Sequence, residues 1–232
     1  MTLTAYFKES SHRFYGAVVA LFMLFSYEVL ILWVPGTGSM IRNAPDAWLR
    51  TLLYYVGLSP HHITFVFITA SLVAIALFYH RKNSFSFRIF LIIIPEAVVF
   101  GILSGFLIQF VMVKLFFMTG SITGSLMGDL GLAVGAGLFE ELFFRVILTT
   151  FLIWGFARVL PVKWMAILLA ILVASFLFSL SHYIGSAGDH FELYSFMFRF
   201  LAGIWFTALF SLRGFAVVSL SHAFYDIFVI LI

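Results

Sequence analysis

Two carboxylates stand side by side at Glu140 and Glu141, and an arginine follows at Arg145. On an α-helix Glu141 and Arg145 are i and i+4, so their side chains lie on one face and can form an ion pair. Glu140 points about 100° away around the helix and is left for another partner. We therefore expect one glutamate to be held ionised by Arg145 and the other to be aimed into a cavity.

Two histidines lie in apolar stretches further along the chain. His182 ends the run FSLSH, and His222 is followed four residues later by Asp226. This spacing allows the Asp226 carboxylate to orient the His222 ring or to share a ligand with it. A single histidine in such a stretch is as often a packing residue as a catalytic one. Two glutamates, two histidines and an aspartate on three apolar segments instead predict one shared polar site.

The composition places these polar groups in a membrane. Of 232 residues, 63% are hydrophobic and 10% are charged, and the mean hydropathy is +1.14. A soluble domain carries about 25% charged residues, so this chain is expected to be covered by lipid. The sequence has no cysteine, which excludes disulfides, thiolate metal sites and a cysteine nucleophile. The net charge of +3 is too small and too scattered for nucleic-acid binding.

The expected fold is one all-α integral membrane domain over residues 1–232, a polytopic bundle of transmembrane helices. A helix of about 20 mostly apolar residues crosses the hydrocarbon core. The third predicted span is long enough to tilt or to kink at Pro95. Pro45–Leu58 mixes apolar side chains with Asp46 and Arg50, which predicts a short interfacial helix. About seven segments qualify as spans: Phe14–Val34, Ile63–Tyr79, Ile89–Met118, Leu132–Phe156, Trp164–Tyr183, Ser195–Leu212 and Phe215–Ile232.

Other ionisable residues inside the predicted spans are isolated in the sequence. Each costs about 2.5–3.5 kcal/mol on insertion, so each needs a partner. Hydrogen bonds or ion pairs that fix helix packing are the expected explanation for this set: Glu28, Glu96, Lys114 and Arg199.

The loop cations predict the orientation, because lysine and arginine are enriched on the cytoplasmic side. One side would hold only Arg42 and Arg50. The N-terminus is then cytoplasmic, in a bacterial inner (cell) membrane, and the loop around Asp129 lies on the far side. The polar residues of the last spans fall in that far half, which predicts access for water and substrate from outside the cytoplasm. The cytoplasmic side would hold Lys8, Arg13, Arg81, Lys82, Arg88, Arg158, Lys163 and Arg213.

The polar residues resemble a known motif series. EExxxR at Glu140 to Arg145, FxxxH at Phe178 and His182, and HxxxN/D at His222 and Asp226 are similar to the motifs of the CAAX-protease and bacteriocin-processing family. The family comprises glutamic-type intramembrane endopeptidases, including prenyl-protein endoproteases. The resemblance covers residues 132–232, with each motif on its own predicted span.

The resemblance implies a role for each matching position. Glu140 would be the general base that activates a water, and His182 would help to position that water. Glu141 would be structural and held by Arg145, with Phe178 as further support.

His222 would stabilise the oxyanion, helped by residue 226, and no cofactor is implied. Family members often have asparagine where this chain has Asp226. An ionised carboxylate cannot donate a hydrogen bond, so Asp226 is either protonated or serves to orient His222. The expected partners are the lipid bilayer and membrane-associated protein or peptide substrates, whether prenylated proteins, bacteriocin precursors or C-terminal sorting tails.

Three other functions compete with this interpretation. A zinc metalloprotease could use a glutamate, both histidines and Asp226 as ligands, although the sequence contains no HExxH motif. A serine protease is disfavoured, because a helical serine next to its own histidine points away from it. A transporter or immunity protein could use the same polar core without catalysis.

Overall fold

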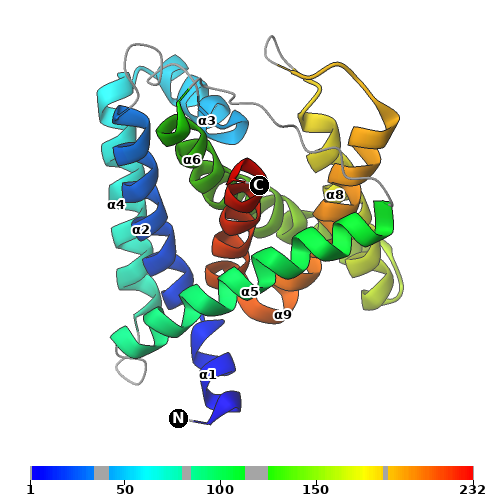
Figure 1. Ribbon diagram of the computed structural model, residues 1–232. Helices are drawn as coiled ribbons and strands as arrows, with labels where there is room; N and C mark the ends of the chain where they lie inside the picture. Colours follow the sequence, from blue (N-terminus) through cyan, green and yellow to red (C-terminus); the bar gives the residue numbers. More distant parts are fainter. Residues whose placement is uncertain (1, 34–41, 80–84, 113–124, 185–187, 232) are drawn as a thin grey trace.

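The computed structural model is a bundle of helices (Figure 1) and describes residues 2–33, 42–79, 85–112, 125–184 and 188–231. Within these ranges no residue lies in a β-strand, and the predicted all-α membrane bundle is confirmed. The elements are α1 Leu3–Ser10, α2 Arg13–Leu32, α3 Ala44–Tyr55, α4 Pro60–Phe78, α5 Phe87–Met112, α6 Leu126–Gly135, the π-helix η1 Ala136–Thr149, α7 Thr150–Val159, α8 Lys163–Ser181 and α9 Leu193–Leu231.

Five of the described helical segments are long and apolar enough to cross a membrane: Arg13–Leu32, Phe87–Ile108, Leu126–Val159, Lys163–Ser181 and Leu193–Leu231. The apolar helix His62–Phe78 is shorter and matches the second predicted span. The last segment contains the sixth and seventh predicted spans, because α9 bends at Gly214. Prediction and structure therefore agree roughly. Lys114 and the predicted end of the third span lie outside the described residues.

Large apolar side chains on the outside of the bundle suit a lipid environment. Phe25, Leu77 and Phe106 are exposed by 69%, 74% and 67%. A water-soluble protein rarely exposes apolar surface on this scale, whereas lipid tails cover it at no cost. Inside the bundle, α2, α5 and α9 pack against η1 through one apolar core, and α5 runs obliquely across the others in Figure 1.

The bend of α9 is joined to α5 by an ion pair and to the N-terminal helix α1 by a hydrogen bond. Arg213, predicted as a loop cation, is instead buried, and its guanidinium contacts Glu96 of α5 at 2.6 Å. The same guanidinium donates to Ser10 at 2.8 Å. Tyr6 of α1 also donates to Glu96, and burial together with that carboxylate raises the pKa of Tyr6 above its ordinary value. Glu96 therefore has the packing role expected of it.

A second group of charges surrounds the start of α3. Arg42 and Arg50, also predicted as loop cations, both contact Glu28 of α2 and Asp46 of α3 at distances between 2.5 and 3.1 Å. Glu28 is thus not isolated once the chain is folded. The predicted interfacial helix exists, but its Asp46 is buried and anchors α3 to α2, while Leu52 stays exposed.

The segment around Asp129 differs from the prediction of a loop. Asp129 is buried within the helix α6, which runs directly into η1. The glycines of this stretch explain the difference, because they allow close packing against α2. A Cβ atom at Gly135 would stand 2.5 Å from the ring of Tyr27.

Candidate active site

The two glutamates lie on a π-helix, Ala136–Thr149, rather than on the predicted α-helix. Its backbone hydrogen bonds join residues five apart instead of four, and such segments are frequent at functional sites. Thr149 follows the same spacing, with its hydroxyl donating to the carbonyl of Phe144 at 2.7 Å. The wider turn changes where successive side chains point. The angle predicted from α-helical geometry between Glu140 and Glu141 therefore does not apply.

Glu141 contacts partners on two helices. Its side chain is fully buried, and Oε2 lies 3.2 Å from Nε of Arg145, so the predicted ion pair is present. Its other oxygen, Oε1, accepts a hydrogen bond from Nδ1 of His222 at 2.7 Å. This second contact was not predicted. Glu141 therefore joins η1 to the C-terminal half of α9.

Arg145 is buried and held mainly by aromatic rings. Within the described residues its guanidinium nitrogens donate no hydrogen bond, and its contact with Glu141 is a pairing of charges. The guanidinium carbon lies 4.4 Å from the ring centroid of Phe178 and 6.0 Å from that of Phe206. Ring faces attract cations, most strongly where water is excluded. Phe178 thus supports the site by direct contact with Arg145.

His182 follows α8, one turn after Phe178. Its Nδ1 lies 2.9 Å from the carbonyl oxygen of Phe178. A carbonyl only accepts, so Nδ1 carries a proton in this contact, and a neutral ring keeps Nε2 as a free acceptor. The Phe178 ring packs edge-on against His182 with centroids 5.1 Å apart. Ring and backbone together fix the orientation of the imidazole.

His222 lies between a carboxylate on each side. Nδ1 bonds to Glu141, and Nε2 lies 3.6 Å from Oδ2 of Asp226. The second distance is an ion-pair contact that exceeds normal hydrogen-bond length. Phe206 stacks on the imidazole face with centroids 4.5 Å apart and planes 14° apart. The ring is therefore fixed from its face and from both nitrogens.

Glu140 has a different partner from its neighbour. It is 8% exposed, and its Oε1 lies 3.4 Å from the amide Nδ2 of Asn43, the residue before α3. It lies within electrostatic range of Arg145 on its own helix, and of His182, His222 and Asp226 on neighbouring segments, but none of these cations is in ion-pair contact with it. Glu140 is thus the carboxylate of the pair that is free of a close cationic partner among the described residues.

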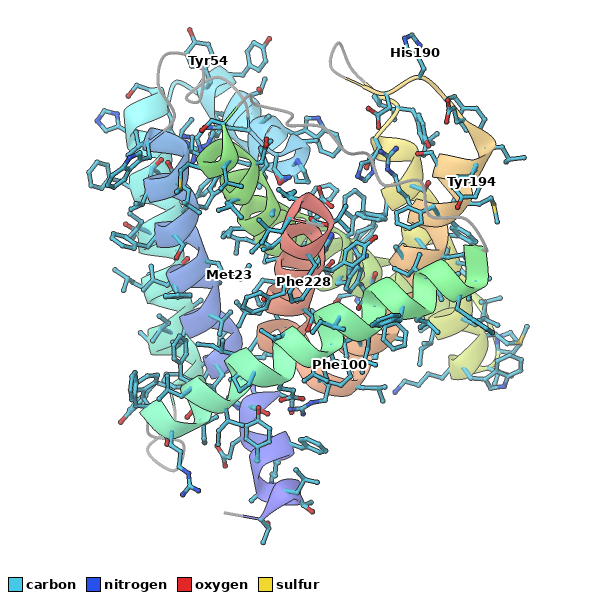
Figure 2. The ribbon with its side chains drawn as sticks, viewed as in Figure 1. Met23, Tyr54, Phe100, His190, Tyr194 and Phe228 are labelled. Atoms are coloured by element: carbon cyan, nitrogen blue, oxygen red, sulfur yellow. The ribbon has the colours of Figure 1, made fainter. Side chains whose placement is uncertain are left out.

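Direct contacts join the predicted site residues of η1, α8 and the C-terminal half of α9: Glu141 meets Arg145 and His222, His222 meets Asp226, and Phe178 meets Arg145 and His182. Glu140 is close enough to interact electrostatically with these groups but directly contacts only Asn43. Among the described residues, no group of three His, Asp or Glu side chains is arranged to hold a metal ion. Figure 2 draws the side chains around these helices, with Phe228 of α9 near the centre of the bundle.

Comparison with known families gives a match in this region. Residues 123–228 match the family described as Rce1-like, the type II CAAX prenyl endopeptidases. This part of the chain is similar to that family. No curated protein and no solved structure matches the chain. The matched range includes η1, α8 and α9, so it contains all three motif segments, and the family is one of CAAX-type intramembrane endopeptidases.

Two residues at the site were not predicted from the sequence. Phe206 is one of 31 phenylalanines, and nothing in its local sequence separates it from a lipid-facing ring. Asn43 precedes Ala44-Pro45-Asp46, a pattern typical of a helix N-terminus. The sequence therefore predicts a capping role for Asn43 and gives no sign of its contact with Glu140.

Proposed function

We propose that this chain is a glutamic-type intramembrane endopeptidase. It would hydrolyse a peptide bond near the C-terminal or membrane-proximal part of membrane-associated proteins. The unequal partners of the two adjacent glutamates carry the proposal. Glu141 is engaged by Arg145 and His222, whereas the Glu140 contact is to a neutral amide. A carboxylate without a cation beside it keeps its ability to accept a proton.

Glu140 is the general base of the proposed reaction. It removes a proton from a water molecule, and the oxygen of that water attacks the carbonyl carbon of the scissile peptide bond. His182 helps to position the water, because its Nε2 can accept the second hydrogen while Nδ1 is held by Phe178. The protonated Glu140 then gives its proton to the leaving amine as the C–N bond breaks. A general base of this kind contributes about 10²–10⁴-fold to a rate.

His222 stabilises the oxyanion that forms at the carbonyl oxygen. With Nδ1–H donated to Glu141, the ring can donate from Nε2 only when it carries both protons. Two carboxylates beside the ring provide the compensating charge for that form. Asp226 is exposed by 27% at its side chain and orients Nε2 rather than donating itself. Donors aimed at developing charge are among the strongest contributors to catalysis.

Glu141 and Arg145 position these groups. Arg145 is packed between two aromatic rings and fixes Glu141, and Glu141 in turn fixes the orientation of the His222 ring. The pair stays inside η1 and needs no contact with substrate. Its contribution is to hold the α9 histidine against the helix that carries the base.

The substrate reaches the site from the non-cytoplasmic side of a bacterial cell membrane. Tyr54 of α3 and His190, after α8, lie at one end of the bundle in Figure 2, and α1 with the N-terminus lies at the other. Asn43 and His182 belong to segments at the Tyr54 and His190 end. The excess of lysine and arginine near the N-terminal end predicts that this end is cytoplasmic. Exported or surface-anchored proteins are therefore favoured over cytosolic prenylated ones.

Comparative proteomics of a Glu140→Gln strain tests the proposed function. Membrane and exported proteins that wild-type cells cut should accumulate uncut in the variant, and purified Glu140→Gln protein should cleave them about 10²–10⁴-fold more slowly. Glu192→Gln is a matched control, because Glu192 is exposed outside the site near the start of α9. Near-normal cleavage by a folded Glu140→Gln protein would remove Glu140 from the role of base.

A further inference from the structure

Asn43 occupies the position before α3 at which asparagine normally caps a helix. A capping asparagine accepts a backbone N–H of the first turn through its side-chain oxygen. Asn43 makes no such bond. Its Oδ1 is buried without a hydrogen-bond partner among the described residues, and its Nδ2 lies 3.4 Å from Oε1 of Glu140. A buried polar atom left without a partner needs an explanation other than stability.

The backbone of Asn43 is fixed by Tyr27 of α2. The Asn43 N–H contacts the Tyr27 hydroxyl at 3.4 Å, and that hydroxyl donates to Asp46 at 2.9 Å. The Tyr27 ring is fully buried and packs edge-on against Phe139, with centroids 5.4 Å apart. Phe139 directly precedes Glu140 on η1. One tyrosine therefore sets the position of Asn43 relative to the helix that carries the glutamate.

The preceding residue, Arg42, restrains the same segment through charge. Its guanidinium contacts both oxygens of Glu28, at 3.0 and 3.1 Å, and Asp46 at 3.0 Å. Burial alone would lower the pKa of Arg42, but the hydrogen bond and the charge of Glu28 outweigh it and hold the pKa above its ordinary value. Arg42 is therefore charged, and its contacts restrain the segment that carries Asn43.

We propose that Asn43 is a positioning residue for Glu140, an inference that rests on the proposed role of Glu140 as the base. The Nδ2–H group holds Oε1 of the carboxylate and leaves the other oxygen to take the proton of the attacking water. The second hydrogen of that water is shared between the free Oδ1 and Nε2 of His182. The site then includes a residue from outside the matched range 123–228.

A neutral amide suits this position better than a charged side chain. The charged and titratable groups that face Glu140 are Glu141 and Arg145 on η1, His182 at the end of α8, and His222 and Asp226 on α9. A cation added at position 43 would strongly favour the ionised form of Glu140. Glu140 would then be a weak base. A second carboxylate there would resist its ionisation. An amide donor orients the oxygen and favours its ionised form less strongly than a cation would.

The test compares Asn43→Ala, Asn43→Gln and Asn43→Asp with wild type on a membrane peptide that wild-type cells cut and Glu140→Gln cells leave intact. Removing a donor from the ionised base disfavours that form, so the base ionises only at higher pH. For Asn43→Ala, kcat should fall about tenfold with little change in KM, and the acidic limb of the pH–kcat profile should move up by about one pH unit. Asn43→Asp should move the limb further, and Asn43→Gln should restore its wild-type position.

Thr51→Ala is the control, because Thr51 is exposed on α3 and donates to Ala47 within its own helix. Thermal unfolding of each purified variant separates folding from positioning. Wild-type kcat and an unmoved acidic limb in Asn43→Ala would overturn the inference. So would a loss of kcat in all three variants with no movement of the limb, since that pattern indicates a structural role. If Glu140→Gln itself keeps its activity, the proposed function fails, and the two failures are thereby distinguished.

Discussion

Gly137 should control whether η1, which carries Glu141, and α9, which carries His222, can approach each other. It lies on η1 one turn before Glu141 and packs against α9 next to His222. A Cβ atom at position 137 would stand 2.3 Å from the carbonyl oxygen of Ser219 and 2.8 Å from the Cβ of Ala223. Both neighbours are rigid parts of α9, so no flexible side chain can move aside.

The structure sets the size of the effect of Gly137→Ala. Ordinary contacts begin near 3.4 Å, so the contact of 2.3 Å must open by 3.4 − 2.3 = 1.1 Å. Overpacking of a tight core costs about 1–3 kcal/mol. A separation of this size would also stretch the 2.7 Å hydrogen bond between Glu141 and His222 beyond hydrogen-bond length. A displacement of about 1 Å at a catalytic group can lower a rate about 10²-fold.

Gly155→Ala provides a matched control on the same continuous helix. A Cβ atom at position 155 would meet nothing within 4 Å, so the substitution should keep or slightly raise stability. The assays are thermal unfolding in detergent and the cleavage rate of purified protein. We expect Gly137→Ala to lose both stability and activity and Gly155→Ala to lose neither. Wild-type stability and activity in Gly137→Ala would show that η1 and α9 are not in direct contact there.

Three further predictions test the buried ion pair, the independence from a metal ion and the orientation in the membrane. Arg145→Ala or Glu141→Ala should lower thermal stability by about 3–5 kcal/mol as well as activity, because each leaves a buried charge unpaired; inactive variants as stable as wild type would assign both residues to the chemistry. Activity should persist after thorough chelation and dialysis, and a loss that added zinc restores would favour a metalloprotease. Single cysteines at Tyr54 and His190, both exposed, should react with an impermeant thiol reagent in intact cells, whereas labelling only at Val159 and Lys163 would invert the topology.

The fold class and the grouping of the site could be predicted because both depend on local patterns. Apolar runs of sufficient length determine the spans. Polar residues inside the spans find most of their interaction partners among one another. The pairs Glu141 with Arg145 and His222 with Asp226 are four residues apart, so any helix brings each pair within reach. These predictions do not depend on the exact residue at which each helix begins or ends.

Features that depend on distant segments could not be predicted in this way. Arg213 follows an apolar run and resembles a loop cation, yet Glu96, which neutralises it, is 117 positions away in the sequence. Arg42 and Arg50 are explained in the same way by Glu28, which lies on another helix. The orientation prediction is unaffected by these ion pairs, because loop cations act during insertion, before the helices have packed.

The sequence predicts an α-helix at Glu140 and Glu141, where the structure has a π-helix, yet the predicted ion pair between Glu141 and Arg145 is present. Widening the turn moves Glu140 and Glu141 relative to an α-helix, but Arg145 is long enough to reach Glu141 in either geometry, so the ion pair does not distinguish the two. The contacts on other segments do distinguish them. Glu141 must face α9 to meet His222 while Glu140 faces the segment before α3 to meet Asn43. The two adjacent carboxylates thus face two different walls of one site, and this division supports the proposal that Glu140 is the base while Glu141 holds His222 in place.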